Sequence, residues 1–131
     1  MAVLTPEAAT ALDHEAAVRS VPDVVGFLAD VLGARMTAHL AGLRDVKQIS
    51  RYRREDGPRP GDAVERRLRE GYKVVRTLTD AYGPATAKAW LLGTNSRLDD
   101  RAPVDVLRHA VDGQDFTDGV RAARQAASFE A

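Results

Sequence analysis

The segment from residue 62 to residue 82 carries the longest helical pattern in the chain and constrains the fold more than any other feature. Its apolar residues recur every three or four positions, as in a helix that buries one face. This stripe consists of Val64, Leu68, Tyr72, Val75, Leu78 and Tyr82, whereas Arg66, Arg67, Arg69 and Lys73 lie off it. The segment therefore predicts a long amphipathic helix with Asp62 as its N-cap.

Glycine and proline divide the rest of the chain into shorter segments. Thr5-Pro6-Glu7 predicts a helix start, and the Ala-rich segment that follows to about Arg19 is expected to bury little surface. Two prolines and two glycines make residues 56–62 a loop. Further helical segments begin near Ser20, Met36, Asp45, Pro84, Pro103 and Gly113. Because no stretch alternates strongly enough for a strand, we predict an all-α fold.

The composition agrees with this fold class. A chain of 131 residues has the length of one compact domain, or of two small helical modules that share a core. Hydrophobic residues make up 44%, enough for a core, and the low aromatic content of 5% favours helices over a sandwich or barrel. The chain has no cysteine, no apolar run of the ~20 residues that span a bilayer, and no signal-peptide pattern. We therefore expect a cytoplasmic protein without membrane association.

Charge is unevenly distributed although the chain as a whole is neutral. Residues 44–76 contain eleven Lys and Arg residues against six Asp and Glu residues, so that a basic middle lies between acidic ends. Residues 35–54, which overlap this region, have the outline of a helix-turn-helix, whose second helix would enter the major groove of DNA. Ile49 and Tyr52 would anchor that helix to the core. The candidate DNA-binding residues are Arg44, Lys47, Gln48, Arg51, Arg53, Arg54 and Arg59, with Arg66 and Arg67 as further phosphate contacts. The alternative is a solvated charged helix face.

Motifs of catalysis and of cofactor binding are missing from the sequence. His14, His39 and His109 are widely separated, and none has a metal-ligand spacing to another histidine. Neither a phosphate-binding loop nor a dinucleotide-binding glycine pattern occurs. Asp99 and Asp100 are adjacent in a polar turn, where they face water more often than they share a site. The sequence therefore favours a binding protein, without a cofactor or a metal, over an enzyme.

The C-terminal half carries a series of short motifs at characteristic spacing. They are Ala87-x-x-Trp90-Leu91, then Asn95-x-x-Leu98, then Pro103-x-Asp105-x-Leu107, and then a final amphipathic segment. Alone, Trp90 is typical of a core anchor and Asn95 of a turn. These motifs follow Ile49-Ser-Arg-Tyr52-Arg-Arg, Pro60 and the helix of Leu68, Tyr72 and Val75. In this order, the whole series resembles the antitoxins that join an Xre-like helix-turn-helix to an MbcA/ParS-type toxin-binding domain.

The resemblance covers roughly residue 22 to the C-terminus and implies a division of the chain. Residues 22–81 would form the helix-turn-helix domain and residues 82–131 the toxin-binding domain with its C-terminal tail. Residues 1–21 lie outside the resemblance and would form an Ala-rich N-terminal arm. It also implies a function: neutralisation of a RES-domain toxin, which consumes NAD, by obstruction of its active site. Autorepression of the operon through operator DNA is implied as well, with a homodimer inside a larger complex.

Carried over by position, the resemblance also implies which residues contact the toxin. The implied contacts are Asn95, Arg97, Asp99, Arg101, Phe129, Glu130 and Ala131, and the implied scaffold is Trp90, Leu91 and Pro103. Two alternatives stay open beside this hypothesis. One is a helix-turn-helix repressor without a toxin partner, whose C-terminal half serves for dimerisation. The other is a toxin-binding module whose helix-turn-helix has lost affinity for DNA.

Overall fold

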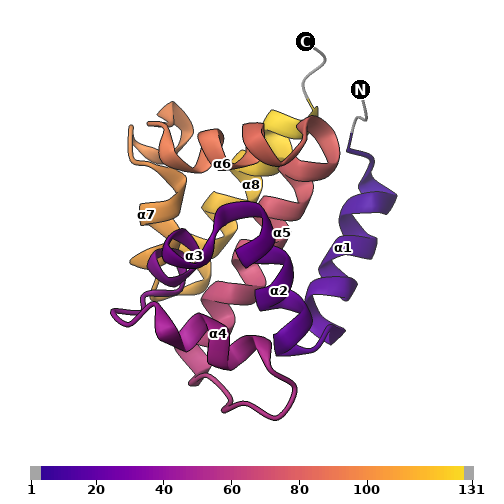
Figure 1. Cartoon of the computed structure of the whole chain (residues 1–131). Helices are drawn as coiled ribbons and strands as arrows, with labels where there is room; N and C mark the ends of the chain where they lie inside the picture. The colour runs from indigo at the N-terminus through magenta and orange to yellow at the C-terminus, as the bar shows by residue number, and fades with distance from the viewer. Residues whose placement is uncertain (1–3, 129–131) are drawn as a thin grey trace.

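The computed structural model describes residues 4–128, and within this range the protein is all-helical, which confirms the predicted fold class. Figure 1 shows the helices gathered around one long central helix. In chain order they are α1 (Pro6–Val18), α2 (Val21–Leu32), α3 (Ala34–Ala41), α4 (Lys47–Arg53), α5 (Asp62–Tyr82), α6 (Pro84–Leu92), the 3-10 turn η1 (Ser96–Leu98), α7 (Pro103–Arg108) and α8 (Gly113–Ser128).

Helix α5 is the central element, and the helices α1, α2, α3, α6, α7 and α8 pack against it. The predicted stripe is confirmed on its buried face, where Leu68, Tyr72, Val75 and Leu78 are almost inaccessible to water. Gly83 ends the helix with a positive φ of 91°, a backbone conformation that residues with a Cβ rarely adopt. At the other end the predicted N-cap is wrong by one residue: Gly61 occupies the cap position and Asp62 begins the helix.

Helices α3 and α5 approach each other closely at Gly71. This residue is buried inside α5, and a Cβ built on it would lie 2.6 Å from Leu40 Cδ2 of α3. Leu40 is itself fully buried, so it has little room to move. A glycine inside a helix costs stability relative to alanine, and here that cost is offset by the closer packing of two helices.

Helix α1 is fixed to α5 mainly by polar contacts. Only Leu12 and Ala16 of its residues are buried, in agreement with the small apolar face expected for the Ala-rich segment. The guanidinium of Arg69 donates hydrogen bonds to the carbonyl oxygens of Ala16, at 3.0 Å, and of Arg19, at 2.7 Å. These bonds satisfy carbonyl groups at the C-terminal end of α1, where a helix leaves acceptors without an internal partner.

One hydrophobic core extends through both halves of the chain. Its buried residues run from Leu12 in α1 to Ala123 in α8 and include side chains from α2, α3, α5, α6 and α7. A second, small cluster joins Leu98, Val106 and Ala122 next to the half-buried Trp90. The helices of residues 22–81 and 82–131 are therefore packed as one body within the described residues.

Candidate nucleic-acid and protein interfaces

Helix α4 is held at the surface of the bundle by two apolar anchors. Ile49 and Tyr52 are buried, as the helix-turn-helix hypothesis requires, and α4 packs against α2 and α3. Residues 42–46 connect α3 to α4, and Gly42 ends α3 in a left-handed conformation. The Asp45 carboxylate accepts a hydrogen bond of 2.9 Å from the backbone N–H of Lys47 and so satisfies one free donor at the start of α4.

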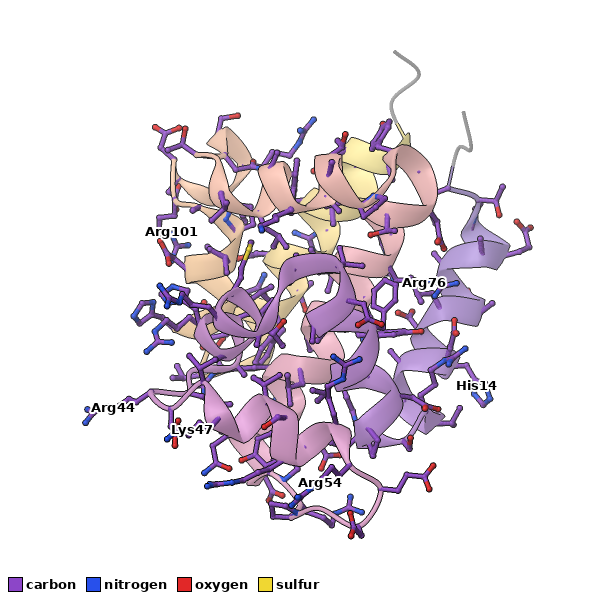
Figure 2. The ribbon with its side chains drawn as sticks, in the orientation of Figure 1. His14, Arg44, Lys47, Arg54, Arg76 and Arg101 are labelled. Atoms are coloured by element: carbon purple, nitrogen blue, oxygen red, sulfur yellow. The ribbon has the colours of Figure 1, made fainter. Side chains whose placement is uncertain are left out.

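The solvent-facing side of this region carries cations without ion pairs. Arg44, Lys47 and Arg51 are exposed, and none forms an ion pair within residues 4–128. Figure 2 shows Arg44, Lys47 and Arg54 pointing outward at the α4 end of the molecule. Gln48, another candidate DNA-binding residue, is half-buried. Exposed cations without an ion pair are the side chains to which phosphate groups bind.

The other predicted DNA-binding arginines take part in surface ion pairs. Arg53 reaches Asp30 of α2 at 2.9 Å, Arg54 lies 4.0 Å from Asp56, and Arg59 lies 3.5 Å from Glu65. All three arginines are exposed, and exposed ion pairs contribute on the order of 0–1 kcal/mol. These pairs therefore leave the arginines able to exchange a carboxylate for a phosphate.

Two arginines that the sequence suggested as phosphate contacts point elsewhere. Arg67 is turned toward the bundle, where its guanidinium donates to the carbonyl oxygens of Ala41, at 3.5 Å, and Ala110, at 3.3 Å. Arg66 stacks over the ring of Phe116 with its guanidinium carbon 4.7 Å from the ring centroid. Both lie on α5, and the same helix also supplies the buried stripe, so helical position alone could not distinguish a solvent-facing from a structural arginine.

The segment from Asn95 to Arg101 forms a closed loop around Asn95. The backbone N–H of Asn95 donates to the Arg101 carbonyl at 3.2 Å, and the Asn95 carbonyl accepts from the N–H groups of Leu98 and Asp100, both at 2.9 Å. Its side-chain oxygen accepts from the N–H of Arg97 at 3.0 Å. Asn95 is half-buried. Its hydrogen bonds hold the loop together, and part of the residue also belongs to the loop surface.

The tip of this loop is exposed and conformationally strained. Asp99 and Asp100 have φ angles of 57° and 61°, a left-handed conformation that costs free energy for residues other than glycine. Their side chains and that of Arg97 are exposed, whereas Leu98 between them is buried. Arg101 is also exposed and donates from Nε to the Leu98 carbonyl at 3.1 Å. The loop thus presents charged side chains from a backbone fixed by hydrogen bonds.

Of the residues proposed as scaffold, Trp90 packs against the cluster that contains Leu98 of this loop. Leu91 and Pro103 are buried and Trp90 is half-buried. The C-terminal contacts Phe129, Glu130 and Ala131 lie outside the described residues. The preceding turn of α8 is tied to α5, because the Tyr82 hydroxyl donates to the carbonyl of Ala126.

A third surface, which sequence patterns did not indicate, is a groove of about 680 Å³ between α3, α6 and α7. Its residues come from three separate stretches of the chain, residues 32–39, 88–92 and 102–105, so no single periodicity marks it. One local signal exists: the sequence of α6 is apolar nearly all round and leaves Leu92 58% exposed. The lining residues are Leu32, Gly33, Ala34, Arg35, Met36, His39, Lys88, Leu92, Ala102, Val104 and Asp105.

Within residues 4–128 no cluster of three or more His, Asp or Glu side chains has an arrangement that could hold a metal ion. No helix in this range combines the length and hydropathy needed to cross a membrane. The fold and its surfaces define a small helical protein with a cationic helix at one end and a hydrogen-bonded loop elsewhere on the bundle. Comparison with protein-family models, curated proteins and solved structures finds no match to this chain.

Proposed function

We propose that this protein is an antitoxin that binds and neutralises a RES-domain toxin and represses its own operon by binding operator DNA. The proposal joins the order of C-terminal motifs around Trp90, Asn95 and Pro103 to the geometry of the exposed surfaces. One observation carries it: a single bundle presents two chemically different surfaces, the cations of α4 and the charged loop of residues 95–101. Figure 2 shows Arg54 and Arg101 in separate regions of the molecule.

Recognition of DNA is assigned to α4 and its flanks. Residues 44–59 contain six cations and three acids, and Arg44, Lys47 and Arg51 among these cations form no ion pair in the described part of the chain. In this proposal Lys47, Gln48 and Arg51 face the base edges, while Arg44, Arg53, Arg54 and Arg59 neutralise phosphates. A homodimer would present two copies of α4 to a palindromic operator.

Recognition of the toxin is assigned to the loop of residues 95–101 together with the last three residues of the chain. The loop is supported by the burial of Leu98 and by the hydrogen bonds around Asn95, which fix its charged tip before binding. A preformed surface loses less conformational entropy when it binds. Strained residues in an exposed loop, such as Asp99 and Asp100, are also characteristic of functional surfaces.

DNA binding is tested with the double variant Lys47→Ala and Arg51→Ala. We expect loss of operator binding in a fluorescence-anisotropy titration, because the variant lacks two of the three side chains that the proposal assigns to the base edges. The matched control Lys88→Ala and Arg121→Ala removes the same charge from α6 and α8 and should bind DNA as before. Unchanged affinity of the α4 variant would contradict the assignment.

Neutralisation is tested by growth of cells that express a RES-domain toxin encoded beside this protein. The α4 double variant should still rescue growth and should co-purify with the toxin. Deletion of residues 128–131, or Asp99→Asn combined with Asp100→Asn, should weaken rescue while leaving DNA binding intact. Operator binding without any rescue or co-purification by the unaltered protein would instead establish the repressor without a toxin partner.

A further inference from the structure

The groove between α3, α6 and α7 has an apolar floor and wall. Leu32 and Val104 are buried at its base, and Met36 and Ala102 are half-buried. Leu92, at the C-terminal end of α6, remains 58% exposed. A partner's apolar side chains bind favourably to apolar surface in a concave site, because binding removes both surfaces from water.

The rim of the groove is cationic. Arg35 and Lys88 are exposed and form no ion pair within the described residues. The acid of the rim, Asp105, is already engaged, because its Oδ1 lies 2.9 Å from Nε2 of His39. The groove therefore offers two unmatched positive charges beside apolar surface, and carboxylates are their complement.

A second groove of similar size lacks this complementarity. It measures about 660 Å³ and lies between α1, α5 and α8. Three of its four cations are matched by carboxylates within the protein: Lys73 reaches Glu70 at 3.2 Å, Arg121 lies 3.7 Å from Asp118, and Arg124 is paired with Asp13. The fourth, Arg66, stacks on the ring of Phe116. A ligand there would have to displace internal ion pairs, whereas a ligand between α3, α6 and α7 would meet free ones.

From these observations we propose that the groove between α3, α6 and α7 binds an acidic, amphipathic helical segment of a partner protein. Its apolar side chains would cover Leu92 and Met36 above the floor formed by Leu32 and Val104, and its carboxylates would pair with Arg35 and Lys88. Most of the lining residues are exposed, so the groove is too open to enclose a small molecule, which ordinarily buries most of its surface. A helix laid along an open groove satisfies both the apolar and the charged requirement. This inference does not depend on the identity of a toxin.

The test uses the full chain and two labelled synthetic peptides. Both are amphipathic helices with leucine on one face, and they carry glutamate or lysine on the other. We expect the glutamate peptide to bind about tenfold or more tightly than the lysine peptide, and Leu92→Ser to weaken it by about tenfold. Arg35→Glu combined with Lys88→Glu should reverse the preference between the two peptides.

Two control variants and two measurements test whether the groove is the binding site. Val111→Ser removes an apolar side chain that is 82% exposed outside the groove and should leave binding unchanged. Lys47→Ala with Arg51→Ala should also bind normally, which separates this site from the cations of α4. Thermal unfolding followed by circular dichroism verifies that each variant is folded. Methyl NMR shifts should be confined to Met36, Leu92 and Val104 and their neighbours.

Several outcomes would overturn the inference. These are absence of glutamate-peptide binding at millimolar concentration, an unchanged preference in the charge-reversed variant, and methyl shifts elsewhere on the bundle. Binding of dodecanoate at Leu92 without binding of either peptide would also reject it, because the groove would then be a small-amphiphile site.

Discussion

At the scale of single residues, several residues have roles that their positions in the sequence do not indicate. Gly71 allows α3 and α5 to meet, and Arg67 joins the end of α3 to the end of α7 through the carbonyls of Ala41 and Ala110. Arg108 adds a third link by donating to the His39 carbonyl at 2.8 Å. Cations at the C-terminus of a helix also interact favourably with its dipole.

The close contact at Gly71 predicts a large difference between two glycine substitutions. Gly71→Ala should lower the free energy of unfolding by about 1–3 kcal/mol, because the new Cβ must displace Leu40 from a packed core. Gly119→Ala is the matched control: that residue is also buried in a helix, but its Cβ would meet Leu107 at an ordinary 3.7 Å. It should stabilise the protein by about 0.5–1 kcal/mol. Urea denaturation measures both, and equal effects would refute the packing argument.

We expect the carboxyl group of Glu15 to make the stability of the folded protein sensitive to acid. Burial alone raises the pKa of its carboxyl, but hydrogen bonds from Arg19 and Tyr72 and the charges of Arg19 and Arg76 outweigh burial, and the net pKa lies below the ordinary 4.5. Because the folded-state pKa is lowered, the stabilisation is fully present above the unfolded-state pKa. It is lost as the pH falls through the folded-state pKa.

Replacement of this carboxylate by an amide tests the prediction. Glu15→Gln should lower the unfolding free energy at neutral pH, and the difference from the unaltered protein should shrink as the pH falls below 4.5. Chemical denaturation across the acid range provides the measurement. A difference that stays constant with pH would show that Glu15 stabilises by packing alone.

At the scale of elements, the loop of residues 95–101 shows how a short segment becomes a defined surface. One residue, Asn95, supplies the N–H, the carbonyl and the side-chain oxygen that close it, and Leu98 fixes it to Val106 and Ala122. The helices behave differently, because their own backbone bonds define them and packing only selects their buried faces. The conformation of the loop therefore depends on a few hydrogen bonds and on two residues in the left-handed conformation.

The left-handed conformation of Asp99 and Asp100 predicts that side-chain size decides stability at these positions. Asp99→Gly with Asp100→Gly should be more stable than Asp99→Ala with Asp100→Ala by about 1 kcal/mol per position, because glycine alone has no Cβ to strain. Both pairs remove the same two charges, so electrostatic effects cancel in the comparison. Thermal and urea unfolding give the values. An alanine variant equal to the glycine variant would show that the loop relaxes out of this conformation.

At the scale of the whole molecule, one core joins the segments that the resemblance assigns to separate domains. Side chains of α1, α2, α3, α5, α6, α7 and α8 belong to the same buried cluster. The division at residues 21/22 and 81/82 remains a prediction about function. The continuous core favours cooperative unfolding across it.

The single tryptophan gives a direct test of this cooperativity. Trp90 lies on α6, beside the small cluster of Leu98, Val106 and Ala122, whereas circular dichroism reports on every helix. We expect denaturation curves from tryptophan fluorescence and from circular dichroism to coincide, with one midpoint and one slope. Two separated transitions would instead show that residues 22–81 and 82–131 unfold independently.

Most of the helices follow from the sequence because their causes are local. Apolar spacing, prolines at helix starts and glycines at helix ends predicted α2, α5 and the loop before α5, and Ile49 and Tyr52 were correctly assigned to the buried side of α4. Leu91 and Pro103 are buried, and their role as scaffold for a binding surface stays a prediction. These features depend on residues a few positions apart, which is the range over which sequence patterns are informative.

Only the tertiary structure decided which charged residues are free and which are structural. Arg67 and Arg51 have the same chemistry, yet the first is bonded to carbonyls of residues 41 and 110, and the second is exposed to solvent. The groove beside Leu92 likewise exists only where α3, α6 and α7 meet. Local periodicity does not encode contacts between residues so far apart, because they depend on how the helices pack around α5. The sequence determined the helices, and their packing determined the surfaces.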